Sequence, residues 1–183
     1  MKVGTNACAG RTALAFTVVL LAASAGAQEL PRSIKGDPRQ PELTYVRPDG
    51  LGVTEISLTA AQVEALRRGS SKTAFAYIAY TSISEPDLIG GIDAFDLLPL
   101  EFVGYYFALA VANFSALPHT GTVTMKLSGP TPWTERFNGV TVNGNTVTVL
   151  WWRAAPLQRV GNYLFKGTMS GAGSMKSRFC AGC

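Results

Sequence analysis

The segment from Phe102 to Phe114 constrains the fold of this chain more than any other. Side chains there alternate between two kinds with a period of two, which is typical of a β-strand and not of a helix. The large ones are Val103, Tyr105, Phe107, Leu109 and Val111, and the small ones are Gly104, Ala108, Ala110 and Ala112. Because small side chains let another layer approach closely, we expect a central strand that is covered on both faces.

Further short strands are predicted on both sides of this segment. They cover Thr73 to Thr81, the stretch in which Val123, Met125 and Leu127 alternate with polar residues, and Val160 to Met169 as the final strand. Short strands separated by Pro, Gly and Asn turns favour a mainly β chain folded as an antiparallel β-sandwich with an immunoglobulin-like architecture. A small barrel is the main alternative, and the Cys, Trp and Cys spacing of true immunoglobulin domains is absent.

An Asn143-Gly144 pair inside Val140 to Val149 predicts a β-hairpin. Both residues tolerate the positive φ angles of a two-residue type I′ turn. That turn would place Val142 opposite Asn145 and Val140 opposite Val147. The valines of the two arms would then share one face of a sheet.

One short α-helix is predicted from about Ala60 to Arg68, with Thr59 as its N-cap. Gln62 stands three residues after the cap, which is the capping-box arrangement. Leu58 and Val63 occupy the positions of a hydrophobic staple. Gly69 ends the helix, and Arg67 and Arg68 complement its dipole, so the arginine pair needs no binding role.

Residues 1–27 are typical of a secretory signal peptide that forms a signal helix. They contain Lys2 and Arg11, the apolar run Ala13 to Ala23, and the small-residue motif Ala25-Gly26-Ala27. The apolar run is shorter than the roughly 20 residues that a membrane span needs, which disfavours an uncleaved anchor. We therefore expect cleavage after Ala27, a secreted or periplasmic protein that begins at Gln28, and no transmembrane span afterwards.

Four segments follow from this division: the signal peptide 1–27, an extended proline-rich leader 28–51, a β-sandwich domain 52–170, and a glycine-rich tail 171–183. The leader is expected to hold one edge strand near Thr44 to Arg47. Without Lys2 and Arg11, 14 of the 16 basic residues remain against 12 acidic ones, so the net charge falls to +2. Because these basic residues are scattered, the sequence does not predict a nucleic-acid-binding protein.

The tail ends in Cys180 and Cys183, which are the candidate disulfide. An oxidising compartment favours a small local bridge. Bridges to another chain are one alternative. Redox or metal chemistry is the other, but the pair does not precede a helix and has few neighbouring ligands.

Trp152 and Trp133 are the candidate binding residues, since flat indole faces suit sugar rings. Trp151 and Trp152 must point to opposite faces of a strand. Alternation from Val147 and Val149 groups Trp151 with the valines, which leaves Trp152 as the surface candidate. The alternative is that the helix, the leader or a sheet edge covers Trp152, because tryptophan is highly buried on average.

The segment 85–101 is acidic and holds no basic residue: Glu85, Asp87, Asp93, Asp96 and Glu101. It would suit calcium or paired carboxylate chemistry, but its spacing fits a solvated loop better. His119 stands alone in a predicted turn, without an identifiable nucleophile. No catalytic residue, metal ligand or cofactor is therefore assigned.

These observations favour a module that acts by protein interaction or by structural assembly of the cell envelope, without catalysis. Its partner would be an envelope or extracellular protein, with polysaccharide as the other candidate. A carbohydrate-binding module that uses a surface tryptophan is the alternative function. An enzyme, either an acidic-site hydrolase or a terminal dithiol oxidoreductase, comes third.

Overall fold

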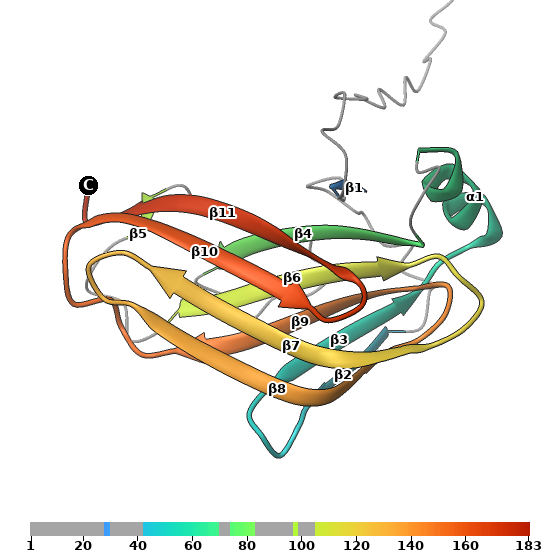
Figure 1. The fold of residues 1–183 in the computed structure, drawn as a ribbon, viewed down its shortest axis with the longest axis horizontal. Coiled ribbons are helices and arrows are strands. Elements are labelled where there is room, and N and C mark those ends of the chain that lie inside the picture. Colours follow the sequence, from blue (N-terminus) through green and yellow to red (C-terminus); the bar gives the residue numbers. More distant parts are fainter. Residues whose placement is uncertain (1–27, 30–41, 70–73, 83–96, 99–104) are drawn as a thin grey trace, which may run out of the picture.

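The computed structural model describes residues 28–29, 42–69, 74–82, 97–98 and 105–183. These residues form two β-sheets that pack face to face, together with the helix α1 (Ala60–Gly69) (Figure 1). The prediction of a mainly β sandwich is confirmed, whereas an immunoglobulin-like arrangement stays a prediction. The predicted signal peptide 1–27 and the acidic residues of segment 85–101 lie outside the described residues.

One sheet has six strands and the other has five. The six-stranded sheet runs in the order β1 (Gln28–Glu29), β4 (Phe75–Ser82), β6 (Tyr105–Asn113), β9 (Thr146–Ala154), β3 (Gly52–Ser57) and β2 (Glu42–Val46). The five-stranded sheet runs in the order β5 (Leu97–Leu98), β11 (Gly173–Ala181), β10 (Gly161–Met169), β7 (His119–Ser128) and β8 (Trp133–Val142). Neighbouring strands are antiparallel, except that β1 pairs with β4 and β5 with β11 in parallel.

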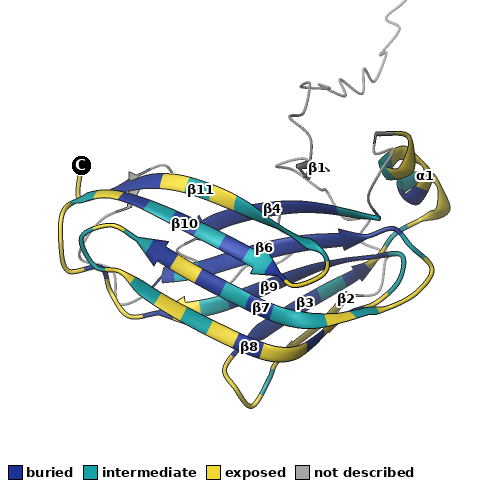
Figure 2. Cartoon of the chain, viewed as in Figure 1, coloured by how far each residue is buried: buried dark blue, intermediate teal, exposed yellow. Residues whose placement is uncertain are grey.

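The predicted central strand is confirmed as β6, which lies between β4 and β9. Its large side chains, such as Phe107 and Leu109, point into the core between the sheets. Its alanines belong to a second apolar cluster on the other face of the six-stranded sheet. Both faces of β6 are therefore buried, as the alternation of large and small residues predicted (Figure 2).

The predicted hairpin at Asn143-Gly144 is wrong. β8 pairs with β7 in the five-stranded sheet, whereas β9 pairs on both sides with β3 and β6 in the other sheet. Asn145 donates its N–H to the Ser115 carbonyl at 2.9 Å and accepts from the Leu58 N–H at 2.7 Å. These bonds hold the connection as an arch between the sheets, because β9 has no ladder edge left for β8.

The arch also separates the two groups of valines. Val140 and Val142 lie in the core between the sheets, whereas Val147 and Val149 lie in the outer cluster. Gly144 passes so close to the Ala116 carbonyl that a Cβ atom would have no room there. The Asn-Gly pair therefore serves a tight crossing from one sheet to the other, and not a two-residue turn.

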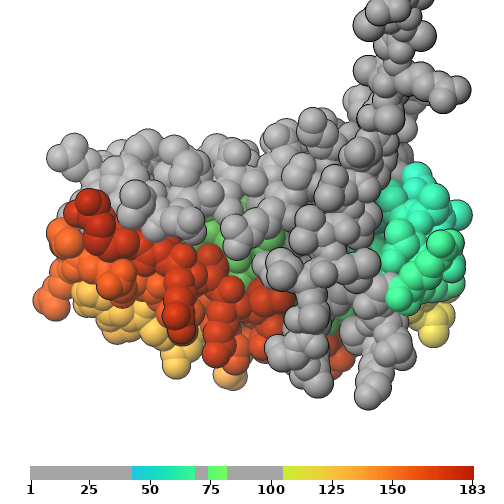
Figure 3. All heavy atoms as spheres, turned by 90° about the horizontal axis from the view of Figure 1, so that it is seen from above, coloured from blue at the N-terminus to red at the C-terminus, as the bar shows by residue number. Residues whose placement is uncertain are grey.

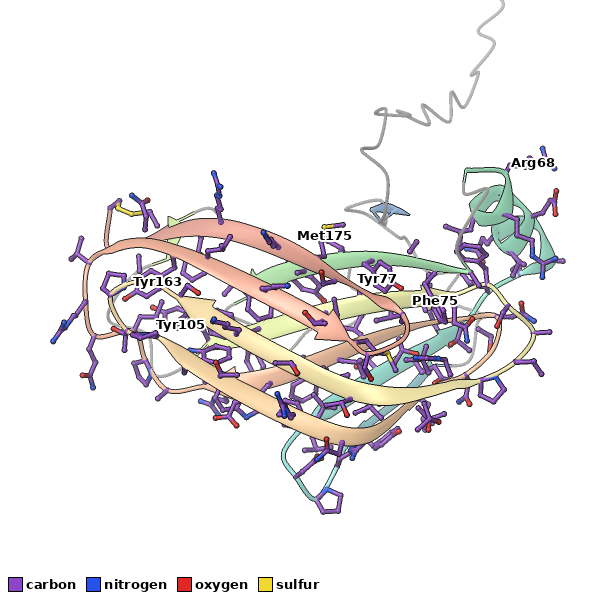
Figure 4. All side chains as sticks on the ribbon, in the orientation of Figure 1. Arg68, Phe75, Tyr77, Tyr105, Tyr163 and Met175 are labelled. Carbon is purple, nitrogen blue, oxygen red and sulfur yellow. A yellow bond between two sulfur atoms is a disulfide. The ribbon has the colours of Figure 1, made fainter. Side chains whose placement is uncertain are left out.

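The predicted glycine-rich tail 171–183 is also wrong, and Val160 to Met169 is not the final strand. β11 (Gly173–Ala181) follows and pairs with β10 along its whole length. The alternation was hard to read because the inward side of β11 includes Gly173 as well as Phe179. Gly173 lies against the ring of Tyr77, which brings β11 and β4 close together (Figure 4). Burial raises the pKa of the Tyr77 phenol.

The predicted helix and its capping box are confirmed. Thr59 donates its N–H to Gln62 Oε1 at 2.8 Å, and the Gln62 N–H donates to Thr59 Oγ1 at 3.3 Å. α1 packs Val63 and Leu66 against the outer cluster at one end of the molecule (Figure 3). Arg67 donates to the Phe114 carbonyl at 3.1 Å, so it ties the helix end to the residue that follows β6. No helix in the described ranges has the length and apolar character to cross a membrane.

We expect Gly173→Ala to lower the free energy of unfolding by about 1 to 3 kcal/mol, as overpacking of a dense core commonly does. A Cβ atom at this position would lie 2.9 Å from the Tyr77 ring. Ser174→Ala, one residue along the same strand, is the matched control and should have little effect. Denaturant unfolding measures both, and equal stabilities would contradict the tight contact between β11 and β4.

Candidate functional site: the edge strand β2

The edge strand predicted within the leader is present as β2, the outermost strand of the six-stranded sheet. It pairs only with β3 among the described strands. Arg47 donates its N–H to the Leu51 carbonyl at 2.8 Å, and Gly50, at a φ of 84°, closes the turn between the strands. Because bonding alternates along an antiparallel strand, the backbone groups of Val46 point away from β3.

The side chains of β2 form an exposed apolar strip. Leu43, Tyr45 and Val46 are 58 %, 45 % and 58 % exposed, and they are three of the five large apolar side chains exposed in the described ranges. Tyr45 lies opposite Val53, a residue of the core between the sheets, so it faces that side. Val46 lies opposite Gly52, over which the Trp151 ring packs on the other side. Leu43 and Tyr45 therefore make one face of the strand apolar, whereas Val46 shares the other face with Thr44, whose hydroxyl donates to Thr54 Oγ1 at 3.2 Å.

The inward side chains of β2 are not fully covered by the other sheet. Leu43 and Tyr45 point to the side on which the five-stranded sheet lies, yet both remain exposed. The six-stranded sheet ends at β2 and the five-stranded sheet ends at β8. A further strand could pair with β2 and place its side chains beside Leu43 and Tyr45.

The neighbouring edge strand β8 is protected against such pairing. The Arg47 guanidinium donates to the carbonyls of Asn138 at 2.8 Å and Gly139 at 3.2 Å, and it pairs with Asp49 at 3.0 Å. Glu135 shares the inward side of β8 with Trp133 and Phe137. The ladder to β7 is also irregular between Gly121 and Val123. Bulges and inward charges are known devices against edge pairing, and β2 has none of them between Leu43 and Val46.

The two tryptophans singled out from the sequence lie together at the opposite end from α1. Trp133 and Trp152 have ring centroids 4.9 Å apart at an angle of 63°. Both are partly buried and pack against the core between the sheets, where Phe107 also contacts Trp133 at 4.9 Å. Trp151 and Trp152 face opposite sides, as alternation predicted. Much of each indole therefore serves packing, and carbohydrate binding at Trp152 and Trp133 stays a prediction.

The histidine and the two cysteines that could take part in catalysis or metal binding lie in contacts within the fold. His119 Nε2 donates to the Ser170 carbonyl at 2.7 Å, and its ring meets Phe75 edge-on at 5.2 Å. The histidine thus joins the start of β7 to the turn between β10 and β11. Cys180 and Cys183 lie within disulfide-bonding distance at the end of β11. In the parts of the chain that the structure describes, no group of three His, Cys, Asp or Glu side chains could hold a metal ion.

No protein-family model matches this sequence, and no curated protein matches it either. Among solved structures, the chain is similar to parts of two β-glucosidases. The chain is similar to one from Listeria innocua with a TM-score of 0.37 and 16 % identity over 61 % of this chain and 17 % of that chain. It is similar to one from Erythrobacter marinus with a TM-score of 0.41 and 13 % identity over 60 % of this chain and 15 % of that chain. This chain thus spans only about a sixth of their length.

The sequence marks this strip as a separate apolar stretch but does not reveal its exposure. Leu43 to Val46 is an uncharged stretch between Pro41 and Pro48, in a segment otherwise rich in charge. Sequence reasoning located a strand there but assigned it no binding role. Its exposure depends on where the five-stranded sheet ends, and β2 itself shows no sign of that.

We expect Arg47→Ala to lower the free energy of unfolding by about 0.5 to 1.5 kcal/mol, the net value of a typical hydrogen bond, since the Arg47 bonds are exposed to water. The substitution removes the bonds to the Asn138 and Gly139 carbonyls. Hydrogen exchange along β8 should also become faster. Arg136→Ala, on the exposed face of β8, is the matched control and should change neither quantity. Unchanged hydrogen exchange along β8 in Arg47→Ala would show that the Arg47 hydrogen bonds do not protect this edge.

Proposed function

We propose that this protein acts without catalysis, by binding an extended segment of a protein partner along β2. The observation that carries the proposal is the exposed apolar strip of Leu43, Tyr45 and Val46 on an edge strand. Strand addition obtains affinity from main-chain hydrogen bonds and specificity from alternate side chains. β2 offers outward backbone groups at Val46 and exposed apolar side chains at Leu43 and Tyr45.

We also propose that this binding takes place outside the cytoplasm, in the periplasm or beyond the cell. The N-terminal pattern supports export, because a basic start, an apolar run and Ala25-Gly26-Ala27 follow one another there. The proximity of Cys180 and Cys183 supports it as well, since disulfides persist in oxidising compartments. The partner would then be an envelope or extracellular protein, and the function would be interaction or structural assembly of the envelope.

Export predicts that the protein recovered from outside the cytoplasm lacks residues 1–27 and begins at Gln28. Ala27→Leu should block this processing, because signal peptidase accepts only small side chains at the cleavage site. Ser33→Leu, outside the recognised motif, is the control and should be processed normally. Intact-mass measurement distinguishes the forms. A chain that keeps Met1 to Ala27 in the cytoplasm would contradict export while leaving the strand proposal open.

Binding along β2 predicts that a photo-reactive amino acid at Val46 cross-links to a protein of one defined mass in living cells. The same group at Thr141, exposed on the protected strand β8, should give no such product. Leu43→Lys should remove the product, because a lysine on an edge strand opposes pairing. Thr134→Lys, an equal change of charge on β8, is the matched control and should preserve it. Equal products from Val46 and Thr141, or none from Val46, would overturn the proposal.

A further inference from the structure

The outer face of the five-stranded sheet gathers positive charge, and we call it the basic face. Five cations lie on it: Lys126 of β7, Arg136 of β8, Lys166 of β10, and Lys176 and Arg178 of β11. All are exposed except Lys166, which is half-buried in the middle (Figure 2). The one acidic residue of these four strands, Glu135, lies on the inward side of β8. The basic residues are scattered along the sequence, and only strand pairing brings them together.

Three of these cations form a row across the sheet. Lys166 lies directly opposite Lys126 on one side and Lys176 on the other. Neighbouring strands are about 4.8 Å apart, so the row is about 10 Å long. Like charges that lie directly opposite in a sheet are destabilising. Among the described residues none of the five cations makes an ion pair, so an external anion would relieve this repulsion.

A row of hydroxyl groups runs beside the row of lysines. Thr124, Thr168 and Ser174 lie opposite one another on the same three strands, and each is two residues from one of the lysines. Arg136 lies opposite Thr124 and extends this second row onto β8. Two parallel rows, one of ammonium groups and one of hydroxyls, therefore cross the strands in the same direction.

We infer that the basic face binds an acidic polysaccharide that lies across β7, β10 and β11. Such a polymer carries carboxylates and hydroxyls along a single chain. Its carboxylates would pair with the lysine row while its hydroxyls exchange hydrogen bonds with the threonine and serine row. This inference goes beyond the proposed function, because the basic face belongs to the sheet that does not contain β2.

Other polyanions fit this face less well. Sites for single-stranded nucleic acid combine cations with aromatic side chains on which the bases stack, and the outward side chains of β7, β8, β10 and β11 include no Phe, Tyr or Trp. Attachment to a membrane surface combines basic residues with large apolar side chains that insert among the lipids. Leu164, the one large apolar side chain outward on β10, is half-buried.

Calorimetric titration of the purified protein with polygalacturonate tests the inference. We expect binding that weakens as salt is added, because salt screens exposed charges. Methyl-esterified polygalacturonate keeps the sugar chain without the charge, and it should not bind.

Two double variants that each remove two positive charges locate the site. Lys166→Gln combined with Lys176→Gln should weaken binding about tenfold, since each exposed ion pair contributes about two- to fivefold. Arg68→Gln combined with Arg153→Gln is the matched control and should bind as the wild type does. Arg68 is exposed at the end of α1, and Arg153 lies opposite Tyr106 on the outer side of the other sheet.

Thermal unfolding supplies a second readout and shows that the variants fold. At low salt and without polysaccharide, Lys166→Gln should unfold at a higher temperature than the wild type, because it removes the repulsion between lysines on neighbouring strands. Polygalacturonate should raise the unfolding temperature of the wild type, as any ligand of the folded state does, and raise that of the variant less.

Absence of binding to polygalacturonate, or equal loss of binding in the two double variants, would overturn the inference. Equal affinity for polyglutamate, which has carboxylates but no sugar hydroxyls, would overturn the polysaccharide as the ligand. Binding to phosphatidylglycerol vesicles but not to polygalacturonate would overturn it as well, in favour of a membrane surface. Leu43→Lys should bind polygalacturonate normally, so this test and the cross-linking test at β2 can fail independently.

Discussion

The whole structure depends on the burial of β6 on both of its faces. Large side chains on one face fill the core between the sheets, and alanines on the other face leave room for the outer cluster. Each neighbour is positioned by this strand, because β4 and β9 pair along its two edges. Replacing one alanine by a large residue would therefore disturb a second layer as well as the strand itself.

The asymmetry between the two side edges of the sandwich follows from this arrangement. At one side β11 approaches β4 closely, since Gly173 presents no side chain to the Tyr77 ring. At the other side Arg47, which follows β2, donates to the carbonyls of Asn138 and Gly139 on β8. One arginine thus covers part of the edge of the five-stranded sheet, whereas β2 pairs only with β3 among the described strands.

The candidate site shows that residue type alone does not determine exposure. A binding role was predicted for Trp133 and Trp152 because flat indole faces suit sugar rings. In the structure their rings contact each other and the core. No binding role was predicted for the apolar strip on β2, because leucine, tyrosine and valine in a strand usually face a core. Exposure separates the two cases, and exposure is a property of the assembled sheets.

The sequence by itself determined the local elements. Alternation predicted β6 and the two-faced strand β7, and Thr59 with Gln62 predicted the start of α1, because these signals depend on neighbours within one element. Only the tertiary structure decided which strands pair. Asn143-Gly144 suits a hairpin equally well, but β9 already bonds on both edges, so the chain crosses between the sheets. The sequence did not predict β11, because Gly173 interrupts its apolar alternation. A glycine is needed there because the Tyr77 ring of β4 packs against it. Contacts between residues far apart in the chain set both outcomes, and they also left β2 exposed.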